Sequence, residues 1–95
     1  MDGVLWYLLA SSRGGPTRVR IIRALNERPR NANELATELD MDYTTIRHHL
    51  DVLLDNNVVR TGGGNYGTVY LFTDQVKSNW NTVDEILETV DPEEP

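Results

Sequence analysis

The sequence predicts a mainly α-helical domain with one small β-hairpin and an additional helix at each end. Three observations predict this class. Apolar residues recur at helical spacing in several segments, β-branched and aromatic residues flank a glycine-rich link, and turn-forming residues separate the segments. The chain has 95 residues, enough for one modest core. It has no cysteine, which excludes disulfides and thiolate metal sites.

The first segment, 4–10, is apolar nearly all round. We predict a helix from Asp2 to about Ser12, with a short strand as the alternative, because so short a run has no decisive period. A membrane helix needs about 20 apolar residues, and no Lys or Arg precedes this run as in a secretion signal. A soluble cytoplasmic protein with no membrane partner is therefore expected.

A second helix is expected to begin at Pro16 and to end before Pro29, since proline suits the first turn of a helix and cannot continue one. Its apolar stripe has helical spacing: Val19, Ile22 and Leu25. Asn31 and Glu34 then have the spacing of a capping box, which predicts a further short helix.

A turn at 40–42 leads into a longer helix, capped by Asp42 and running from Tyr43 to about Asn56. Four apolar side chains share one of its faces: Ile46, Leu50, Leu53 and Leu54. The opposite face is polar. Asn57 suits the left-handed conformation that ends many helices.

Segments 58–61 and 68–72 are rich in β-branched and aromatic residues and flank the glycine-rich link 62–67, which predicts a hairpin with a flexible tip. Beyond it, apolar residues alternate at spacings of four and three, as in a coiled-coil seam: Val76, Trp80, Val83, Leu87 and Val90. The expected organisation is an N-terminal helix and linker at 1–15, a core domain at 16–73, a C-terminal helix at 74–90 and a disordered tail at 91–95.

This order of elements is that of a winged helix-turn-helix domain, whose longer helix enters the major groove of DNA while the hairpin reaches the backbone or the minor groove. Arg47 offers two donors to a guanine edge. We expect DNA contacts from the following residues: Tyr43, Thr44, Thr45, Arg47 and His48, with Arg30 before the short helix and Arg60 and Asn65 in the wing. Solvated faces are the alternative interpretation.

Several stretches resemble the ArsR-like winged helix regulators. Asn33–Leu39 resembles the E-L-A helix of that family, His49-Leu50 with Leu53 matches its H-L-x-x-L pattern, and Val69-Tyr70-Leu71 resembles its last wing strand. The similarity covers about residues 16–72. It implies a DNA-binding transcriptional regulator that dimerises through its terminal helices. The cysteine motif of the metal-sensing members is absent, and the last helix has no histidine, so neither metal nor cofactor is expected.

The terminal helices carry more apolar surface than so short a chain is expected to cover by itself. We therefore predict that they form a homodimer interface: Leu5, Trp6, Leu9, Val76, Trp80, Val83 and Leu87. Such a dimer sets two recognition helices about 34 Å apart on double-stranded DNA, which fits a pseudo-palindromic operator. Packing of both helices onto their own domain is the alternative.

The net charge of −6 is unevenly distributed along the chain. Residues 13–60 carry eight arginines against seven acidic residues, whereas residues 61–95 carry Lys77 against seven acidic residues. The acidic end is expected to stay clear of DNA. Excess acid with a single lysine predicts a protein of a halophilic type from a salt-rich cytoplasm.

Two other functions remain open at this point. The low net basicity favours a winged helix that serves as a protein–protein interaction module without DNA binding, and a small-ligand-responsive sensor is the second alternative. An enzyme is not expected, because no partnered nucleophile or carboxylate dyad can be identified. His49 is expected to be a partly buried structural histidine.

Overall fold

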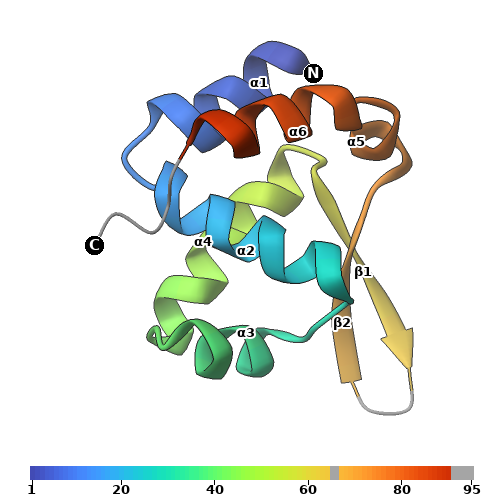
Figure 1. Ribbon diagram of the computed structural model, residues 1–95. Helices are drawn as coiled ribbons and strands as arrows, with labels where there is room; N and C mark the ends of the chain where they lie inside the picture. The colour runs from blue at the N-terminus through green and yellow to red at the C-terminus, as the bar shows by residue number, and fades with distance from the viewer. Residues whose placement is uncertain (65–66, 91–95) are drawn as a thin grey trace.

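The computed structural model describes residues 1–64 and 67–90. Its elements, in chain order, are α1 (Asp2–Trp6), the π-helical segment η1 (Tyr7–Ser11), α2 (Gly15–Glu27), α3 (Ala32–Leu39), α4 (Tyr43–Asp55), β1 (Val59–Gly64), β2 (Gly67–Phe72), α5 (Asp74–Ser78) and α6 (Trp80–Thr89). The predicted class, mainly helical with one antiparallel hairpin in a winged helix-turn-helix arrangement, is confirmed (Figure 1).

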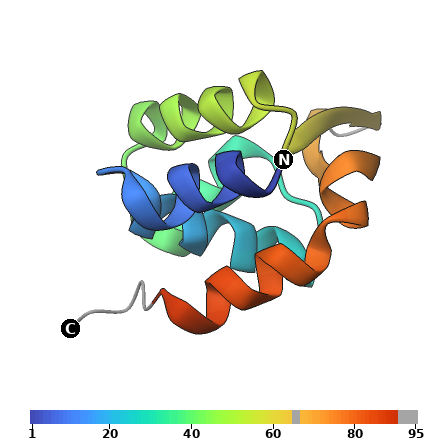
Figure 2. The ribbon, with the colours of Figure 1, turned by 90° about the horizontal axis from the view of Figure 1, so that it is seen from above.

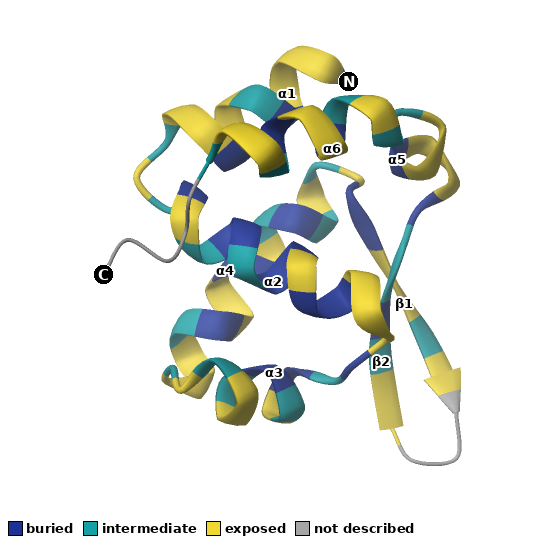
Figure 3. Ribbon diagram, viewed as in Figure 1, coloured by how far each residue is buried: buried dark blue, intermediate teal, exposed yellow. Residues whose placement is uncertain are grey.

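One core joins all the helices. The terminal helices α1, η1, α5 and α6 cover one end of the molecule, and α3 and the lower ends of β1 and β2 lie at the other (Figure 1). Seen from above, α1 and η1 lie between α4 and α6 (Figure 2). Buried residues line α2 and the inward sides of the terminal helices, whereas the hairpin is exposed towards its tip (Figure 3). The largest fully buried side chains come from almost every helix: Leu5, Leu9, Ile22, Leu35, Ile46, Leu50 and Ile86.

The N-terminal segment is helical, as predicted, but its second half is wider than an α-helix. The Ser12 amide donates to the Tyr7 carbonyl at 3.0 Å, which is a bond to the fifth residue before it. The Leu8 carbonyl therefore lacks the amide partner that it would have in an α-helix. It accepts instead from the Arg18 Nε at 3.0 Å and from the Ser12 hydroxyl at 3.2 Å.

The signals at the ends of α3 and α4 act as the sequence predicts. The capping box is complete, because the Glu34 amide donates to Asn31 Oδ1 at 2.8 Å and the Asn31 amide to Glu34 Oε1 at 2.9 Å. Asp42 accepts the amides of Thr44 and Thr45, which fixes the start of α4. Asn57, with φ of 61°, is the expected left-handed residue after α4.

The strands extend further into the glycine-rich link than predicted. Val59 pairs with Phe72 and the ladder continues to Gly64 opposite Gly67, where φ is +102°. Gly62, Gly63 and Gly64 allow this extension because they have no side chains that would need to pack against another part of the protein. The Arg30 carbonyl accepts the Tyr70 amide at 3.0 Å, so the hairpin is tied to the loop before α3. Asn65 and the tail at 91–95 lie outside the described residues.

The C-terminal segment departs from the single helix that the seam predicts. It is divided at Asn79 into α5, capped by Thr73, and α6. Apolar residues spaced by four and three lie on one face only if the helix is continuous. The division at Asn79 therefore changes which residues of α6 face the core. The fully buried positions are Val76, Val83 and Ile86, the last of which the seam omitted. Trp80 packs edge-on against Phe72, with ring centroids 4.8 Å apart.

A single chain covers more of the two terminal stripes than the sequence led us to expect. Four of the residues assigned to a dimer interface are fully buried within the single chain: Leu5, Leu9, Val76 and Val83. They are covered because α6 packs along α1 and α2. The Arg23 guanidinium donates to the Leu87 carbonyl at 2.7 Å, and the Thr82 hydroxyl donates to Asp2 at 2.9 Å. The other three, Trp6, Trp80 and Leu87, keep part of their surface exposed.

Candidate nucleic-acid interface

Helix α4 divides cleanly into a buried and an exposed face. Its buried side chains pack into the core: Ile46, His49, Leu50 and Leu53. Thr44, Arg47 and His48 are exposed, Tyr43 is 44% exposed and Thr45 is half-buried. The residues expected to meet DNA from this helix therefore project from its N-terminal half, away from the core.

Arg47 is held at this surface by its neighbours one turn away. Its Nη1 donates to the Tyr43 hydroxyl at 3.2 Å, and its Nη2 lies 3.7 Å from Asp51 Oδ1. The hydrogen bond to Tyr43 raises the pKa of Arg47, so the guanidinium is fully charged. Asp51 places a carboxylate one turn further along, where it repels phosphate. The favourable part of the helix for DNA is therefore its first two turns.

A cleft of about 330 Å³ opens beside Arg47. It lies between the N-terminus of α3, the start of α4 and the start of β2, and Asn33, Tyr43 and Thr68 line it together with Arg47. All of these groups donate hydrogen bonds, and helix N-termini favour negative charge. The cleft has the chemistry and the position to hold a backbone phosphate next to the exposed face of α4.

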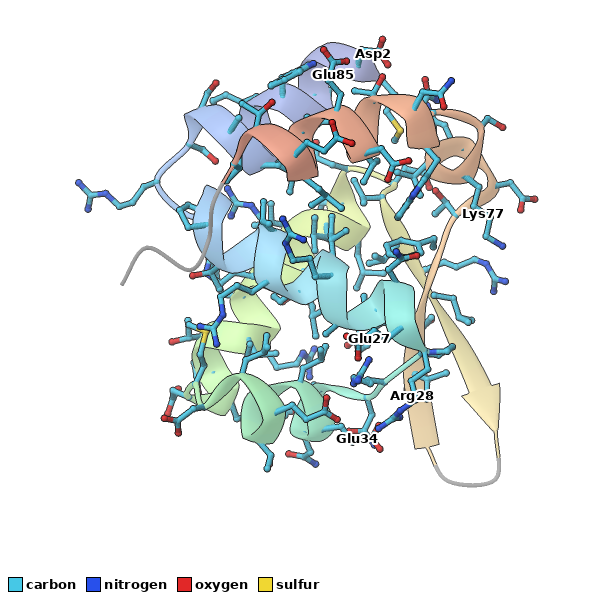
Figure 4. The ribbon with its side chains drawn as sticks, in the orientation of Figure 1. Asp2, Glu27, Arg28, Glu34, Lys77 and Glu85 are labelled. Carbon is cyan, nitrogen blue, oxygen red and sulfur yellow. The ribbon has the colours of Figure 1, made fainter. Side chains whose placement is uncertain are left out.

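Arg30 is not part of this surface, which contradicts the DNA contact expected of it. Its side chain is only 5% exposed and is held by two carboxylates, with Nε 2.6 Å from Glu38 and Nη2 3.2 Å from Glu27. It also donates to the Ala24 carbonyl. Figure 4 shows Glu27, Arg28 and Glu34 gathered at the same junction of α2 and α3. Because Arg30 precedes the cap of α3, the sequence predicted a phosphate contact. In the structure its guanidinium is instead paired with Glu27 and Glu38.

Among the described wing residues, Arg60 does not line this cleft. Arg60 is exposed on β1, opposite Leu71 of β2. The structure brings Tyr43 and Arg47 into direct contact and places Thr68 at the shared cleft, but it does not bring Arg60 to that cleft. Asp2 and Glu85 lie at the opposite end of the molecule from α3 (Figure 4), so acidic terminal helices face away from this surface.

Sequence reasoning missed the buried contact behind the interface. Arg18 is 5% exposed and its Nη1 lies 3.1 Å from His49 Nδ1. The signal was present, because Arg18 precedes Ile22 by four residues and Leu25 by seven and so shares their apolar stripe. The expected structural role of His49 is confirmed, since it is 8% exposed. Burial, with the charge of Arg18 next in effect, lowers the pKa of His49.

Residues 15–61, which include α2, α3 and α4, match the family model described as the bacterial regulatory protein, arsR family. This segment is similar to the helix-turn-helix domains of the ArsR family. ArsR-family domains belong to DNA-binding regulators, not to enzymes. The exposed face of α4 lies wholly inside the ArsR-like segment. No curated protein sequence matches the chain.

The fold is similar to that of several solved structures, two of which are described here. RV1404 from Mycobacterium tuberculosis gives a TM-score of 0.66 at 15% identity, over 93% of this chain and 62% of that one. A probable transcriptional regulator from Pseudomonas aeruginosa gives a TM-score of 0.63 at 13% identity, over 95% of this chain and 76% of that one. The ArsR-like chain therefore spans less than two thirds of the length of the first.

Within residues 1–64 and 67–90, no group of three or more His, Asp or Glu side chains is arranged to hold a metal ion. In the same ranges, every helix is too short or too polar to cross a bilayer.

Proposed function

We propose that the protein is a sequence-specific transcriptional regulator that binds a pseudo-palindromic operator in double-stranded DNA as a homodimer. One observation carries this proposal: the N-terminal half of α4 in an ArsR-like domain exposes a polar face in which Tyr43 holds a charged Arg47. An exposed helix face with a fixed guanidinium is the feature that reads base edges in a major groove.

The contacts of this proposal divide into base-reading and positioning groups. Arg47 donates two hydrogen bonds to a guanine edge, and Thr44 and His48 flank it on the exposed face. The cleft at Asn33 and Thr68 receives a phosphate and fixes the register of α4. Arg60, and Asn65 beyond the described residues, contact the flanking backbone.

The homodimer is proposed on the partly exposed apolar surface of the terminal helices. After the buried residues are set aside, this surface consists of Trp6, Trp80 and Leu87. It lies at the end opposite α3, where a partner leaves both copies of α4 free for DNA. Sedimentation of the purified protein tests this part of the proposal, and a strictly monomeric protein at micromolar concentration contradicts it.

The composition supports a working environment of high salt in the cytoplasm. The net charge is −6 with one lysine, and several arginines are engaged within the fold. At high salt, phosphate attraction weakens for every contact made. Recognition of the operator then depends more on hydrogen bonds of the kind that Arg47 offers.

Selection of bound fragments from random or genomic DNA, in buffers from low to molar KCl, tests the proposal directly. We expect enrichment of one palindromic motif, bound by the wild-type protein and by Lys77→Ala, and bound weakly by Arg47→Ala. Lys77 is the matched control, since it is an exposed cation on α5, away from α4. Equal binding by both variants shows that the assigned face is wrong.

The second candidate is a protein–protein interaction module without DNA binding. The acidic net charge favours it, as do the arginines that bind carbonyl groups and carboxylates inside the fold. An absence of any enriched DNA at every salt concentration, with the protein folded, favours this candidate over the regulator.

A further inference from the structure

A second cavity lies between the N-terminal helix and α4, away from the candidate DNA interface. Its volume is about 450 Å³, within the range of small-molecule sites. Val4, Leu8 and Val52 form apolar walls, and polar groups come from Tyr7, Ser12, Arg18 and Asn56. Val4 is 40% exposed and Tyr7 is 62% exposed, so the mouth of the cavity is open in the single chain. We call this cavity the Arg18 pocket.

Arg18 brings a charge into the pocket that the described part of the chain does not neutralise. Its side chain meets only uncharged acceptors, namely the Leu8 carbonyl at 3.0 Å, His49 Nδ1 at 3.1 Å and the Ser12 hydroxyl. Within residues 1–64 and 67–90, no carboxylate forms an ion pair with it. A guanidinium has more N–H donors than the three acceptors found here. Burial lowers the pKa of Arg18, in agreement with an uncompensated charge.

Arg30 provides an internal comparison. It is as deeply buried as Arg18, at 5% exposed, but Glu27 and Glu38 neutralise it. An unpaired charge taken out of water is costly, and proteins pair such charges as a rule. The same fold therefore buries two guanidinium groups, one with its counter-charge and one beside an open cavity that lacks it.

We propose that the Arg18 pocket binds a small organic carboxylate with an apolar body. The carboxylate accepts from the N–H groups of Arg18 that Leu8, Ser12 and His49 leave unused, since the planar guanidinium matches carboxylate geometry. The hydrocarbon part lies against Val4, Leu8 and Val52. These walls favour an amphipathic anion over an inorganic one, which would leave them in contact with water.

The pocket is shaped before any ligand enters. The wide turn of η1 directs the Leu8 carbonyl to Arg18 Nε, and His49 fixes the other end of the guanidinium. Gly14 leaves the space for this, because a Cβ there would lie 2.5 Å from Arg18 Nη1 and 2.7 Å from His49 Cε1. A preorganised charge loses little freedom when it binds a ligand.

The position of the pocket also suggests what the ligand controls. Val52 and Asn56 line it from α4, the helix whose other end carries Arg47. If the ligand binds more tightly to one position of α4 than to another, it changes the affinity of the protein for DNA. DNA then changes the affinity of the protein for the ligand by the same factor. This regulatory consequence rests on the proposed function, whereas the binding site itself does not.

Calorimetric titration of the full chain, without DNA, tests the site. The probes are benzoate, naphthoate and octanoate, with naphthamide as the uncharged match for naphthoate. We expect saturable binding of at least one carboxylate, weakened about tenfold or more for naphthamide and for Arg18→Gln. In nitrogen–proton correlation spectra, the Arg18 Nε signal should shift with the bound fraction.

A second pair of variants keeps the test valid if Arg18→Gln does not fold. Val4→Glu supplies a carboxylate at the exposed wall of the pocket and is expected to compete with the probe, lowering its affinity about tenfold. Ala10→Glu adds the same charge at an exposed position of η1 that does not line the pocket, and should bind as the wild type does. Three results overturn the proposal: no carboxylate saturates up to about 10 mM, naphthamide binds as well as naphthoate, or Val4→Glu leaves the affinity unchanged. Because no DNA is present, such a failure leaves the proposed DNA binding standing.

Discussion

Arg18 of α2 donates a hydrogen bond to Nδ1 of His49 on α4 at 3.1 Å, and both side chains are buried. An arginine has no acceptor, so His49 must be the acceptor and must carry its proton on Nε2. The imidazole is therefore neutral in the folded protein. This contact fixes α4 from behind, on the side opposite Arg47.

The His49 contact predicts that the protein loses stability in mild acid. The pKa of His49 is lowered on folding from its ordinary value of 6.5, so the unfolded chain takes up this proton first as the pH falls. We expect the free energy of unfolding to be unaffected by His49 above pH 6.5 and to fall below it, until the lowered folded pKa is passed. Chemical denaturation at several values between about pH 8 and about pH 5 measures this fall.

His49→Gln is the informative variant, because glutamine keeps an acceptor for Arg18 and does not titrate. The loss of stability between the two ends of that pH range should be smaller in His49→Gln than in the wild type. His48→Gln removes an exposed histidine that is the smallest of the three causes lowering the pKa of His49, so it should keep most of the wild-type dependence. Identical pH dependence in all three proteins would show that His49 is not the responsible group.

A second prediction concerns Arg30, whose role changed from DNA contact to internal support. Arg30→Ala removes the buried guanidinium that links α2 and α3, whereas Glu27 and Glu38 keep their access to water, so we expect a loss of about 1.5–3 kcal/mol. Arg28→Ala is the matched control. Arg28 is exposed and pairs with Glu34 and Glu38 in water, so its loss should cost about 1 kcal/mol or less. Urea denaturation of both variants decides the matter, and similar costs would refute the structural role of Arg30.

Glycine at position 14 provides a third prediction. Gly14→Ala places a methyl group against Arg18 and His49, and we expect a loss of about 1–3 kcal/mol from overpacking. Gly3→Ala is its control, since a Cβ there meets nothing within 4 Å and alanine favours a helix. The melting temperature should fall for Gly14→Ala and rise slightly for Gly3→Ala. A Gly14→Ala protein as stable as the wild type would mean that Arg18 has room to move.

The fold could be predicted further from the sequence than the site could. Local signals were sufficient for α3 and α4, because Asn31 with Glu34 and Asp42 act on amides within three residues. The division at Asn79 and the wide turn at Tyr7–Ser11 depend on packing between distant segments, which no local pattern records. The same holds for the site. The exposed face of α4 can be predicted from the helical period of its apolar residues. The partners of Arg30 and Arg18 cannot, because they depend on which helices and loops pack together in the fold.

A fourth prediction concerns salt. The chain carries a net charge of −6, and screening of its self-repulsion should stabilise it. We expect the free energy of unfolding to increase as KCl is raised from about 0.2 M to about 3 M. Urea unfolding at each KCl concentration measures the effect. A flat or falling dependence would contradict the assignment to a salt-rich environment.

The wide turn of η1 makes the length of the N-terminal segment matter as much as its composition. With one residue fewer between Tyr7 and Ser12, the Ser12 amide would lie four residues after Tyr7, as in an α-helix, and the preceding segment would be rotated relative to α2, so that the Leu8 carbonyl would no longer face Arg18. The guanidinium of Arg18, which is only 5% exposed, would then lose one of its three acceptors. Shortened chains should therefore fold poorly even when every apolar side chain is kept.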